Sequence, residues 1–556
     1  MNPSPRNAAR ILVDQWRVQG VNHVFTVPGE CCVPVFDALL DAPTIRLIVN
    51  RHESGSGFMA CAYARLTGQP GVALVARGPG ATNAAIAVHA ARQDSLPLVL
   101  FVGDVSTARR EREAFQEIDL QAMFAPVAKW SVEAGRADRL PEIVARAFQV
   151  ATSGRPGPVV VSIPEDVLSA AATVLDARCH SPVQAAPSDM QIAALGNRLR
   201  GARRPVLIAG GSGWTAAACA NLADFARANV LPVVCAFRRQ DLFDSREPNY
   251  VGEAGLGIDP RLAQRIRDSD LVMVFGSRLS EAASSGYALI DAPVPGQTLV
   301  HAHAGVEELG RVYQADLMIN TGMPQLASRL AMMAPVQDPP WAGELAAARA
   351  EFLQWRERPA VVSQLQPALD PWEVVRTLRE VLPDDAIVCN GAGNYAAWLH
   401  RFFDHVEPGT QLAPTGGAMG YAVPAAVAAK IVAPERTVVC VTGDGDFLMS
   451  SQELATAAQC NAGVVVVLFD NGMYGTIRMH QERAHPGRPT ASALVNPDFA
   501  AMAKAYGGTG WRIERTAEFA PALTEAIAKA RATRRPSLLW LACDPRLLSP
   551  SMALGT

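Results

Sequence analysis

Several features are scarce in this sequence, and each absence narrows the class of protein. The longer apolar runs, such as residues 464–469, are far too short to cross a bilayer. Asp14 and the arginines around it interrupt the N-terminal stretch, so we expect no signal peptide. The ten cysteines include no CxxC pair and follow no regular spacing, which favours reduced thiols. We therefore expect a soluble cytoplasmic protein without a membrane partner.

An excess of charge of one sign is also missing. The sequence contains no long run of Lys or Arg, and its formal net charge is −3 at pH 7. So small a charge creates no overall field that would attract nucleic acid or an acidic membrane. We expect no nucleic-acid partner.

The chain of 556 residues is too long for a single core, and its length predicts about three or four domains. Continuous apolar stretches alternate with Ala-rich helical stretches, which is typical of parallel sheets covered by helices on both faces. Polar, Pro-containing linkers are predicted at residues 175–189 and 333–367. We predict an α/β fold of three doubly wound parallel-sheet domains, at residues 1–174, 190–334 and 366–556, with the first and last thirds alike at coarse scale.

The most specific motif lies in the last third. A predicted strand at residues 437–442 runs into Gly443-Asp444-Gly445-Asp446, and a second, at 464–469, ends in Asp470-Asn471. Asn471 lies 27 positions after Asp444, the length of one strand–helix–strand crossover, so both residues are expected at the carboxyl ends of neighbouring strands. The Asp444 carboxylate, the Asn471 amide and the Met473 carbonyl are oxygen donors suited to Mg²⁺. Gly443 and Gly445 allow backbone N–H groups to approach a phosphate.

With this motif the sequence resembles the thiamine diphosphate enzymes of the acetolactate synthase type along nearly its whole length. The resemblance implies bound thiamine diphosphate and Mg²⁺, with Asp444, Asn471 and Met473 as the metal ligands. Asp446 and Asp470 depart from the usual family residues and add negative charge near the diphosphate. Met419 would wedge the cofactor into a bent shape, or would simply pack in the core. The implied cofactor contacts are Glu53, Gly393, Asn394, Tyr395, Gly417, Met419, Gly443, Asp444, Gly445, Asp446, Asn471, Met473 and Tyr474.

A glutamate in the first third completes the resemblance. Glu53 follows a predicted strand at residues 45–49, and family members carry there a Glu that binds the ring nitrogen of the cofactor's aminopyrimidine. A carboxylic acid at that nitrogen favours the tautomer that activates the cofactor. The alternative is an acid that faces the N-terminal end of a helix dipole.

The remaining pocket residues are also implied by the resemblance. Phe115 and Gln116 would lie near the reacting carbon, and the His-His pair of simple 2-oxo-acid decarboxylases is missing from this region. His480 stands where acetolactate synthases have a Trp, in a segment at residues 472–489 that we expect to be a mobile loop or a lid. Arg77 is either a solvated charge or a substrate contact. The substrate pocket is predicted from Pro28, Gly29, Arg77, Gly78, His480 and Arg478, and with Arg483 it suggests a polar or anionic substrate.

The middle third gives weaker signals. Residues 210–213 form a Gly-rich turn after a strand, and residues 252–257 partly match the segment that contacts FAD in acetolactate synthases. FAD is one candidate ligand, ADP is the ligand of the oxalyl-CoA decarboxylases, and a purely structural domain is as good an interpretation.

The implied reaction is decarboxylation of a 2-oxo acid followed by carboligation to a second carbonyl compound. The alternatives are a 2-hydroxyacyl-CoA lyase or oxalyl-CoA decarboxylase, which would carry a basic C-terminal extension, and a simple 2-oxo-acid decarboxylase. A cofactor-binding scaffold without activity would lack Glu53. The resemblance further implies a homodimer or homotetramer with active sites at the subunit interfaces.

Overall fold

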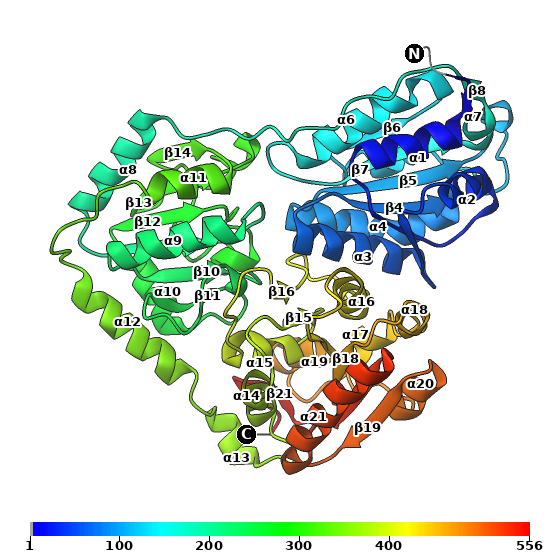
Figure 1. The fold of residues 1–556 in the computed structure, drawn as a ribbon. Helices are drawn as coiled ribbons and strands as arrows, with labels where there is room; N and C mark the ends of the chain where they lie inside the picture. The colour runs from blue at the N-terminus through cyan, green and yellow to red at the C-terminus, as the bar shows by residue number, and fades with distance from the viewer. Residues whose placement is uncertain (1–3, 556) are drawn as a thin grey trace.

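The computed structural model describes residues 4–555 and contains three six-stranded sheets, each with helices on both faces (Figure 1). All neighbouring strands within the three sheets run parallel. The central strands are apolar along their whole length because helices shield both faces from water. The predicted α/β fold class is confirmed.

The first and third sheets share one topology. The first has the order β3-β2-β4-β5-β7-β6, and the third has the order β16-β15-β17-β18-β20-β19, so both follow the pattern second-first-third-fourth-sixth-fifth along the chain. The expected likeness of the first and last thirds is therefore confirmed. The first sheet comprises β2 (His23–Thr26), β3 (Arg46–Val49), β4 (Gly71–Ala76), β5 (Leu98–Asp104), β6 (Trp130–Glu133) and β7 (Val159–Pro164). The third comprises β15 (Ile387–Asn390), β16 (Gln411–Leu412), β17 (Val438–Gly443), β18 (Val465–Asp470), β19 (Thr509–Ile513) and β20 (Ser537–Ala542).

The middle sheet has the order β11-β10-β9-β12-β13-β14, in which the chain winds outward from the centre in both directions. Its strands are β9 (Pro205–Ala209), β10 (Val233–Ala236), β11 (Tyr250–Ala254), β12 (Leu271–Phe275), β13 (Thr298–His303) and β14 (Leu317–Asn320). Short two-stranded pairs join β1 (Arg6–Asn7) to β8 (Ala171–Ala172) and β21 (Leu547–Ser549) to β22 (Met552–Ala553).

The helices connect and cover these sheets. Those of the first part are α1 (Ala8–Val18), α2 (Val33–Leu40), α3 (Glu53–Thr67), α4 (Arg77–Asp94), α5 (Leu120–Phe124), α6 (Leu140–Thr152) and α7 (Glu165–Ser169). The middle part has α8 (Asp189–Gly201), α9 (Ala216–Ala228), α10 (Pro260–Arg267), α11 (Met323–Leu330) and α12 (Ala342–Trp355). The last part has α13 (Ala360–Leu365), α14 (Pro371–Val381), α15 (Tyr395–Phe402), α16 (Ala422–Val432), α17 (Asp444–Leu448), α18 (Glu453–Gln459), α19 (Gly475–Ala484), α20 (Phe499–Ala505) and α21 (Thr516–Thr533).

The two predicted linkers differ in structure. Residues 173–188 contain neither helix nor strand, as expected. Residues 333–367 instead hold α12 and α13, and α12 packs Leu345, Ala348 and Phe352 into the middle core. The prolines of this segment flank the helices, which is why its composition looked like that of a linker.

One hydrophobic core joins the first and third sheets. Helix α3, which covers the first sheet, packs directly against α16, which covers the third, and the Phe58 and Tyr421 rings meet edge to face at 5.5 Å. Ten consecutive residues of α3, from Gly55 to Ala64, are buried because the helix lies between two layers. The two sheets are thus held in a fixed relation.

The middle part is tied to the first by an ion pair. The Arg155 guanidinium lies 2.5 Å from the Glu308 carboxylate, and both side chains are almost fully buried. Arg155 also donates to the Ser95 hydroxyl at 2.8 Å. Burial of two charges requires such a partner for each of them.

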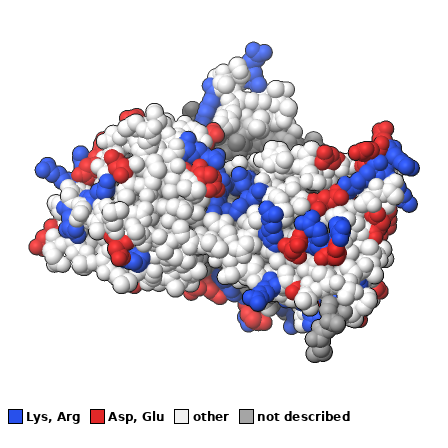
Figure 2. Space-filling view, turned by 90° about the horizontal axis from the view of Figure 1, so that it is seen from above, with Lys and Arg blue, Asp and Glu red and all other residues white. Residues whose placement is uncertain are grey.

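No helix within residues 4–555 is long and apolar enough to span a membrane. On the face shown in Figure 2, Lys and Arg side chains lie among Asp and Glu side chains and form no single basic surface. This distribution agrees with the small net charge.

Replacing Glu308 with Ala is expected to destabilise the protein by about 3–5 kcal/mol, because Arg155 would keep a buried charge without its partner. The matched control is Asp224→Ala, which removes an exposed pair with Arg227 and should cost no more than about 1 kcal/mol. Urea unfolding of both variants, followed by Trp fluorescence, measures the difference. Equal midpoints for the two variants would contradict the prediction.

Candidate functional site

The carboxyl ends of β17 and β18 bring the key residues of the motif together. Gly443 at the end of β17 pairs with Phe469 of β18, so Asp444 and Asn471 follow strand ends that lie side by side. The chain leaves β15 for β16 at the edge of the sheet and returns to β17 on the other side of β15, so the topological switch point lies between β15 and β17, where the Asp444 motif begins. Open α/β sheets bind ligands at such a point.

Asp444 sits in an electrostatically unusual position. Its carboxylate is almost fully buried and accepts a hydrogen bond of 2.8 Å from the Asn496 amide, which also donates to Asp470 at 2.8 Å. Burial, with the neighbouring Asp470 carboxylate, raises the pKa of Asp444 to about 7. Two carboxylates held this close favour a cation between or beside them.

Asn496 was not found from the sequence. It lies outside the motif, just before Pro497, and no periodicity or spacing marks it. Its side-chain oxygen is buried without a hydrogen-bond partner among the described residues. Only the fold brings it beside Asp444.

The Met473 main chain forms an isolated antiparallel bridge with Ala493. The bridge uses the N–H of Tyr474, which donates to Ser492 at 2.8 Å, and the carbonyl of Gly472, which accepts from Leu494 at 2.8 Å. The carbonyl of Met473 takes no part in these two bonds, so it stays available as a ligand. Within residues 4–555 no group of three His, Cys, Asp or Glu side chains is arranged for a metal, so a metal here needs mixed donors.

Asp446 has a structural role that the sequence did not predict. Its buried carboxylate accepts hydrogen bonds from the Gly420 N–H at 2.8 Å, the Thr442 hydroxyl at 2.7 Å and the Tyr395 hydroxyl at 2.9 Å. Burial raises its pKa, and these donors oppose the rise. Asp446 therefore ties three segments of the third part together.

Asp470 is engaged in the same manner. It accepts from the Trp540 indole N–H at 2.7 Å and from the Gly472 N–H at 2.9 Å, besides Asn496. Its charge therefore orients the turn that carries Asn471.

Aromatic rings explain the glycines of the motif. A Cβ atom at Gly443 would lie 2.7 Å from the Tyr395 ring, and one at Gly445 would lie 2.5 Å from the Tyr474 ring. Both tyrosines were predicted as cofactor contacts, and both rings press against the main chain that follows β17. The glycines are needed for this close packing as well as for backbone approach to a ligand.

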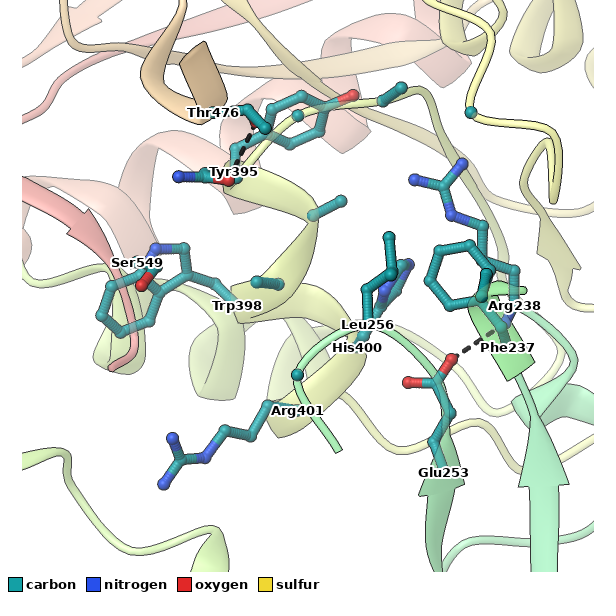
Figure 3. Close-up of a pocket in the computed structure, with 18 of the residues that line it drawn as sticks. Phe237, Arg238, Glu253, Leu256, Tyr395, Trp398, His400, Arg401, Thr476 and Ser549 are labelled. Carbon is teal, nitrogen blue, oxygen red and sulfur yellow. Dashed lines mark hydrogen bonds between the residues drawn. The ribbon is translucent and has the colours of Figure 1, made fainter. Parts of the chain in front are cut away.

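A cavity of about 1140 Å³ opens between the third and middle sheets. Figure 3 shows that Tyr395, Trp398 and His400 line it from α15, and that Phe237, Arg238 and Glu253 line it from the middle part. It brings together these predicted residues: Gly393, Asn394, Tyr395, Gly417, Met419, Gly443, Asp444, Gly445, Asp446, Asn471, Met473, Tyr474 and His480.

The other predicted residues lie outside this cavity. Glu53 begins α3, and its carboxylate accepts from the Asn83 amide at 2.9 Å. The Gln116 carbonyl accepts from the Gly78 N–H at 3.0 Å, and Phe115 is 74% exposed. Within a single chain, therefore, Glu53, Gln116 and Phe115 do not line the cavity.

Arg77 is not a solvated charge. It is buried, lies 2.8 Å from Glu165 and 3.3 Å from Glu30, and has a positive φ of 43°. It lies directly after β4, at the switch point of the first sheet, where a Cβ at Gly29 would lie 2.2 Å from Ala76. Pro28, Gly29, Arg77 and Gly78 are thus gathered at that switch point.

Residues 475–484 form α19, which corrects the expectation of a loop. Arg478 pairs with Glu482 one turn away at 2.7 Å and does not line the cavity, whereas His480 and Arg483 do. The helical phase therefore selects His480 and Arg483 as the cavity-facing polar residues.

The Gly-rich turn at residues 210–213 does not line the cavity. The Trp214 indole donates to the Gly210 carbonyl at 2.7 Å, and Arg239 donates to the Gly211 carbonyl at 2.6 Å. Side chains of the chain itself occupy this turn. Gly252, Glu253 and residues 256–259 do line the cavity, so the second segment, unlike the first, is open to a ligand there.

Comparisons with known proteins find similarity along most of the chain. Three family models match the chain: the thiamine pyrophosphate enzyme N-terminal binding domain at residues 6–123, the central domain at 192–330 and the C-terminal binding domain at 391–539. The acetolactate synthase large subunit of Corynebacterium glutamicum is 32% identical over 94% of this chain and 85% of its own length. The isozyme 3 and isozyme 2 large subunits of Escherichia coli are each 31% identical, over 94% and 93% of this chain and 92% of their own lengths.

The cavity also generates a pH-dependent prediction. The Glu253 carboxylate accepts the Arg238 N–H at 2.9 Å, and burial raises its pKa from 4.5 to about 7. Between these values the folded protein holds a proton that the unfolded chain releases, so stability falls as the pH rises through this window. Above about pH 7 the folded protein has lost all of the stability that depends on the proton of Glu253.

We expect Glu253→Gln to raise the thermal midpoint at pH 8 and to change it much less at pH 5. Differential scanning calorimetry at both pH values measures this, with Glu407→Gln at an exposed position as the control. A gain of the same size at both pH values would count against a protonated Glu253.

Proposed function

The chain belongs to the acetolactate synthase-like thiamine pyrophosphate enzymes, and from this we propose that it decarboxylates a 2-oxo acid and joins the product to a second carbonyl compound. The observation that carries the proposal is the meeting of Asp444 and Asn471 at neighbouring strand ends, inside a cavity that Gly417 and Met419 also line. Similarity to acetolactate synthases over nearly the whole chain supports carboligation as the reaction type.

The residues at the switch point suit a diphosphate and Mg²⁺. The donors of Asp444, Asn471 and the Met473 carbonyl are all oxygens, and a divalent cation would offset the repulsion between the buried Asp444 carboxylate and the half-buried Asp470 carboxylate. Asn496, which bridges the two, would orient Asp444 toward the metal. When bound, thiamine diphosphate supplies the nucleophilic carbon and the electron sink for decarboxylation.

Glu53 is proposed to hold a proton at the aminopyrimidine ring nitrogen of that cofactor. Since Glu53 lies outside the cavity of its own chain, a second copy would have to supply it. Exposed apolar side chains near both halves, including Ile86 on α4, Leu448 on α17 and Ile477 on α19, support such an association. We therefore propose a homodimer as the smallest active unit, with the homotetramer as the next assembly.

On the substrate side, Phe115 and Gln116 of one copy would face His480 of the other. His480 and Arg483 line the cavity, and Arg483 forms no ion pair within the described part of the chain. These groups favour a carbonyl substrate with polar or anionic substituents.

For the middle part of the cavity we propose FAD as the ligand. Arg238, Arg278 and Arg311 line it and offer cations to a diphosphate, and residues 252–257 lie where the sequence predicted a flavin contact. The other candidate, the Gly-rich turn at residues 210–213, already binds the side chains of Arg239 and Trp214 through its carbonyl groups.

The first test is CO₂ release from pyruvate in the presence of thiamine diphosphate and Mg²⁺, with products identified by mass. We expect acetolactate from the wild type, and a loss on the order of 10²–10⁴-fold in Glu53→Gln, which keeps the size of the side chain but not its acid. The absorption spectrum of the same preparation reports bound flavin. Unchanged turnover in Glu53→Gln would contradict the proposed role of this acid.

The metal site makes a separate prediction. Asn496→Ala should raise the Mg²⁺ concentration needed for half-maximal activity by about 10–100-fold, because Asp444 loses the donor that orients it. Asp444→Asn should stay nearly inactive at every Mg²⁺ concentration, because the metal loses its carboxylate ligand. The control is Asn197→Ala on the exposed face of α8, and the measurement is a Mg²⁺ titration after chelation. An unchanged Mg²⁺ titration for Asn496→Ala would show that Asn496 has no role in binding the metal.

A further inference from the structure

A fully buried carboxylate, Glu453, lies where the first and third parts of the chain meet. It is the first residue of α18 and follows Asp444 by nine positions. It does not line the cavity. One of its oxygens accepts the main-chain N–H groups of Arg51 and His52, each at 3.1 Å. The other accepts from the Asn50 amide at 3.0 Å and from the Thr456 hydroxyl at 2.6 Å.

Three of these four donors belong to the residues immediately before Glu53. His52 is the N-cap of α3 and has an extended backbone, with φ −152° and ψ 145°. The main-chain direction at Arg51 and His52 is therefore fixed by a carboxylate some 400 positions away. Because Glu53 begins the helix at the next position, the direction of its side chain depends on this contact.

The site is built for a carboxylate. A carboxylate only accepts hydrogen bonds and offers about four lone-pair positions, which matches the four donors that converge on Glu453. The close approach of α3 also needs a glycine, since a Cβ atom at Gly55 would lie 2.4 Å from the Glu453 oxygen. A general link between the two sheets would not require donors gathered from residues 50–52.

We propose that Glu453 is a positioning residue for Glu53: it holds the turn at residues 50–52 so that the Glu53 carboxylate stays beside Asn83 and points out of its own subunit. This inference rests on the proposed function, in which Glu53 acts on the cofactor bound by a second copy. The charge of Glu453 is not itself used in the reaction.

Three variants separate position from charge. Glu453→Ala leaves the N–H groups of Arg51 and His52 buried without their acceptor. Gly55→Ala keeps the carboxylate but displaces it by steric contact. Glu453→Gln keeps an oxygen for the two N–H groups, and its new amide can donate to the Asn50 side-chain oxygen, which is buried without a partner among the described residues.

Amide hydrogen exchange of the cofactor-free full chain, read by mass spectrometry on the peptide spanning residues 50–55, reports the turn directly. We expect faster exchange in Glu453→Ala and Gly55→Ala and near wild-type exchange in Glu453→Gln. In turnover assays with thiamine diphosphate and Mg²⁺, kcat should fall on the order of 10²-fold in the first two variants, with substrate KM little changed, and should largely survive in Glu453→Gln.

The matched control is Leu454→Ala, the next residue of α18, which loses core packing but has an apolar side chain that cannot accept a hydrogen bond from any of the four donors. It should keep kcat and the exchange of residues 50–55. If Glu453→Ala does not fold, Gly55→Ala carries the same test. Unchanged exchange and kcat in Gly55→Ala, or a kcat loss in Leu454→Ala equal to that in Glu453→Ala, would overturn the inference.

The outcome is distinguishable from failure of the proposed function. Activity lost in Glu53→Gln but kept in Glu453→Ala and Gly55→Ala overturns this inference alone. Full activity in Glu53→Gln overturns the proposed function, and the positioning role with it.

Discussion

The packing of α3 against α16 is the contact on which the arrangement of this protein depends. Each helix covers its own sheet on one face and the other helix on the opposite face, so both are buried all round. The small residues of α3 permit the close approach, and the two sheets then share one core. A shared core does not slide easily, because close-packed side chains have few alternative arrangements.

This fixed relation has a chemical consequence. It places the turn before Glu53 against the first residue of α18, while the Asp444 motif at the end of β17 faces the middle part. Glu53 and the Asp444 motif are thus directed to different surfaces of one chain. A reaction that needs both is naturally completed by a second copy, which is the arrangement we propose.

Three buried carboxylates perform two different tasks in the last part of the chain. Asp446 satisfies main-chain and hydroxyl donors from three segments and so shapes the ends of the strands. Glu453 does the same across the boundary between two sheets. Asp444 instead accepts only from the Gly445 N–H and from the Asn496 amide, which it shares with the Asp470 carboxylate, and burial raises its pKa. Asp444 thus has fewer donors than Asp446 or Glu453, which is one reason why we propose it as the ligand of a cation.

The sequence by itself determined the fold class, the likeness of the first and last thirds, and the meeting of Asp444 with Asn471, because strand period and crossover length fix which strand ends are neighbours. It could not identify Asn496 or Glu453, whose partners are distant along the chain and follow no period. It could not show that residues 475–484 are helical with His480 and Arg483 toward the cavity, nor that α12 fills a predicted linker. Nor could the sequence show the roles of Arg77 and Asp446, because a charged residue looks the same in a sequence whether water surrounds it or a buried partner binds it. Only the tertiary structure decided these points, because burial and hydrogen-bond partners arise when separate elements pack together.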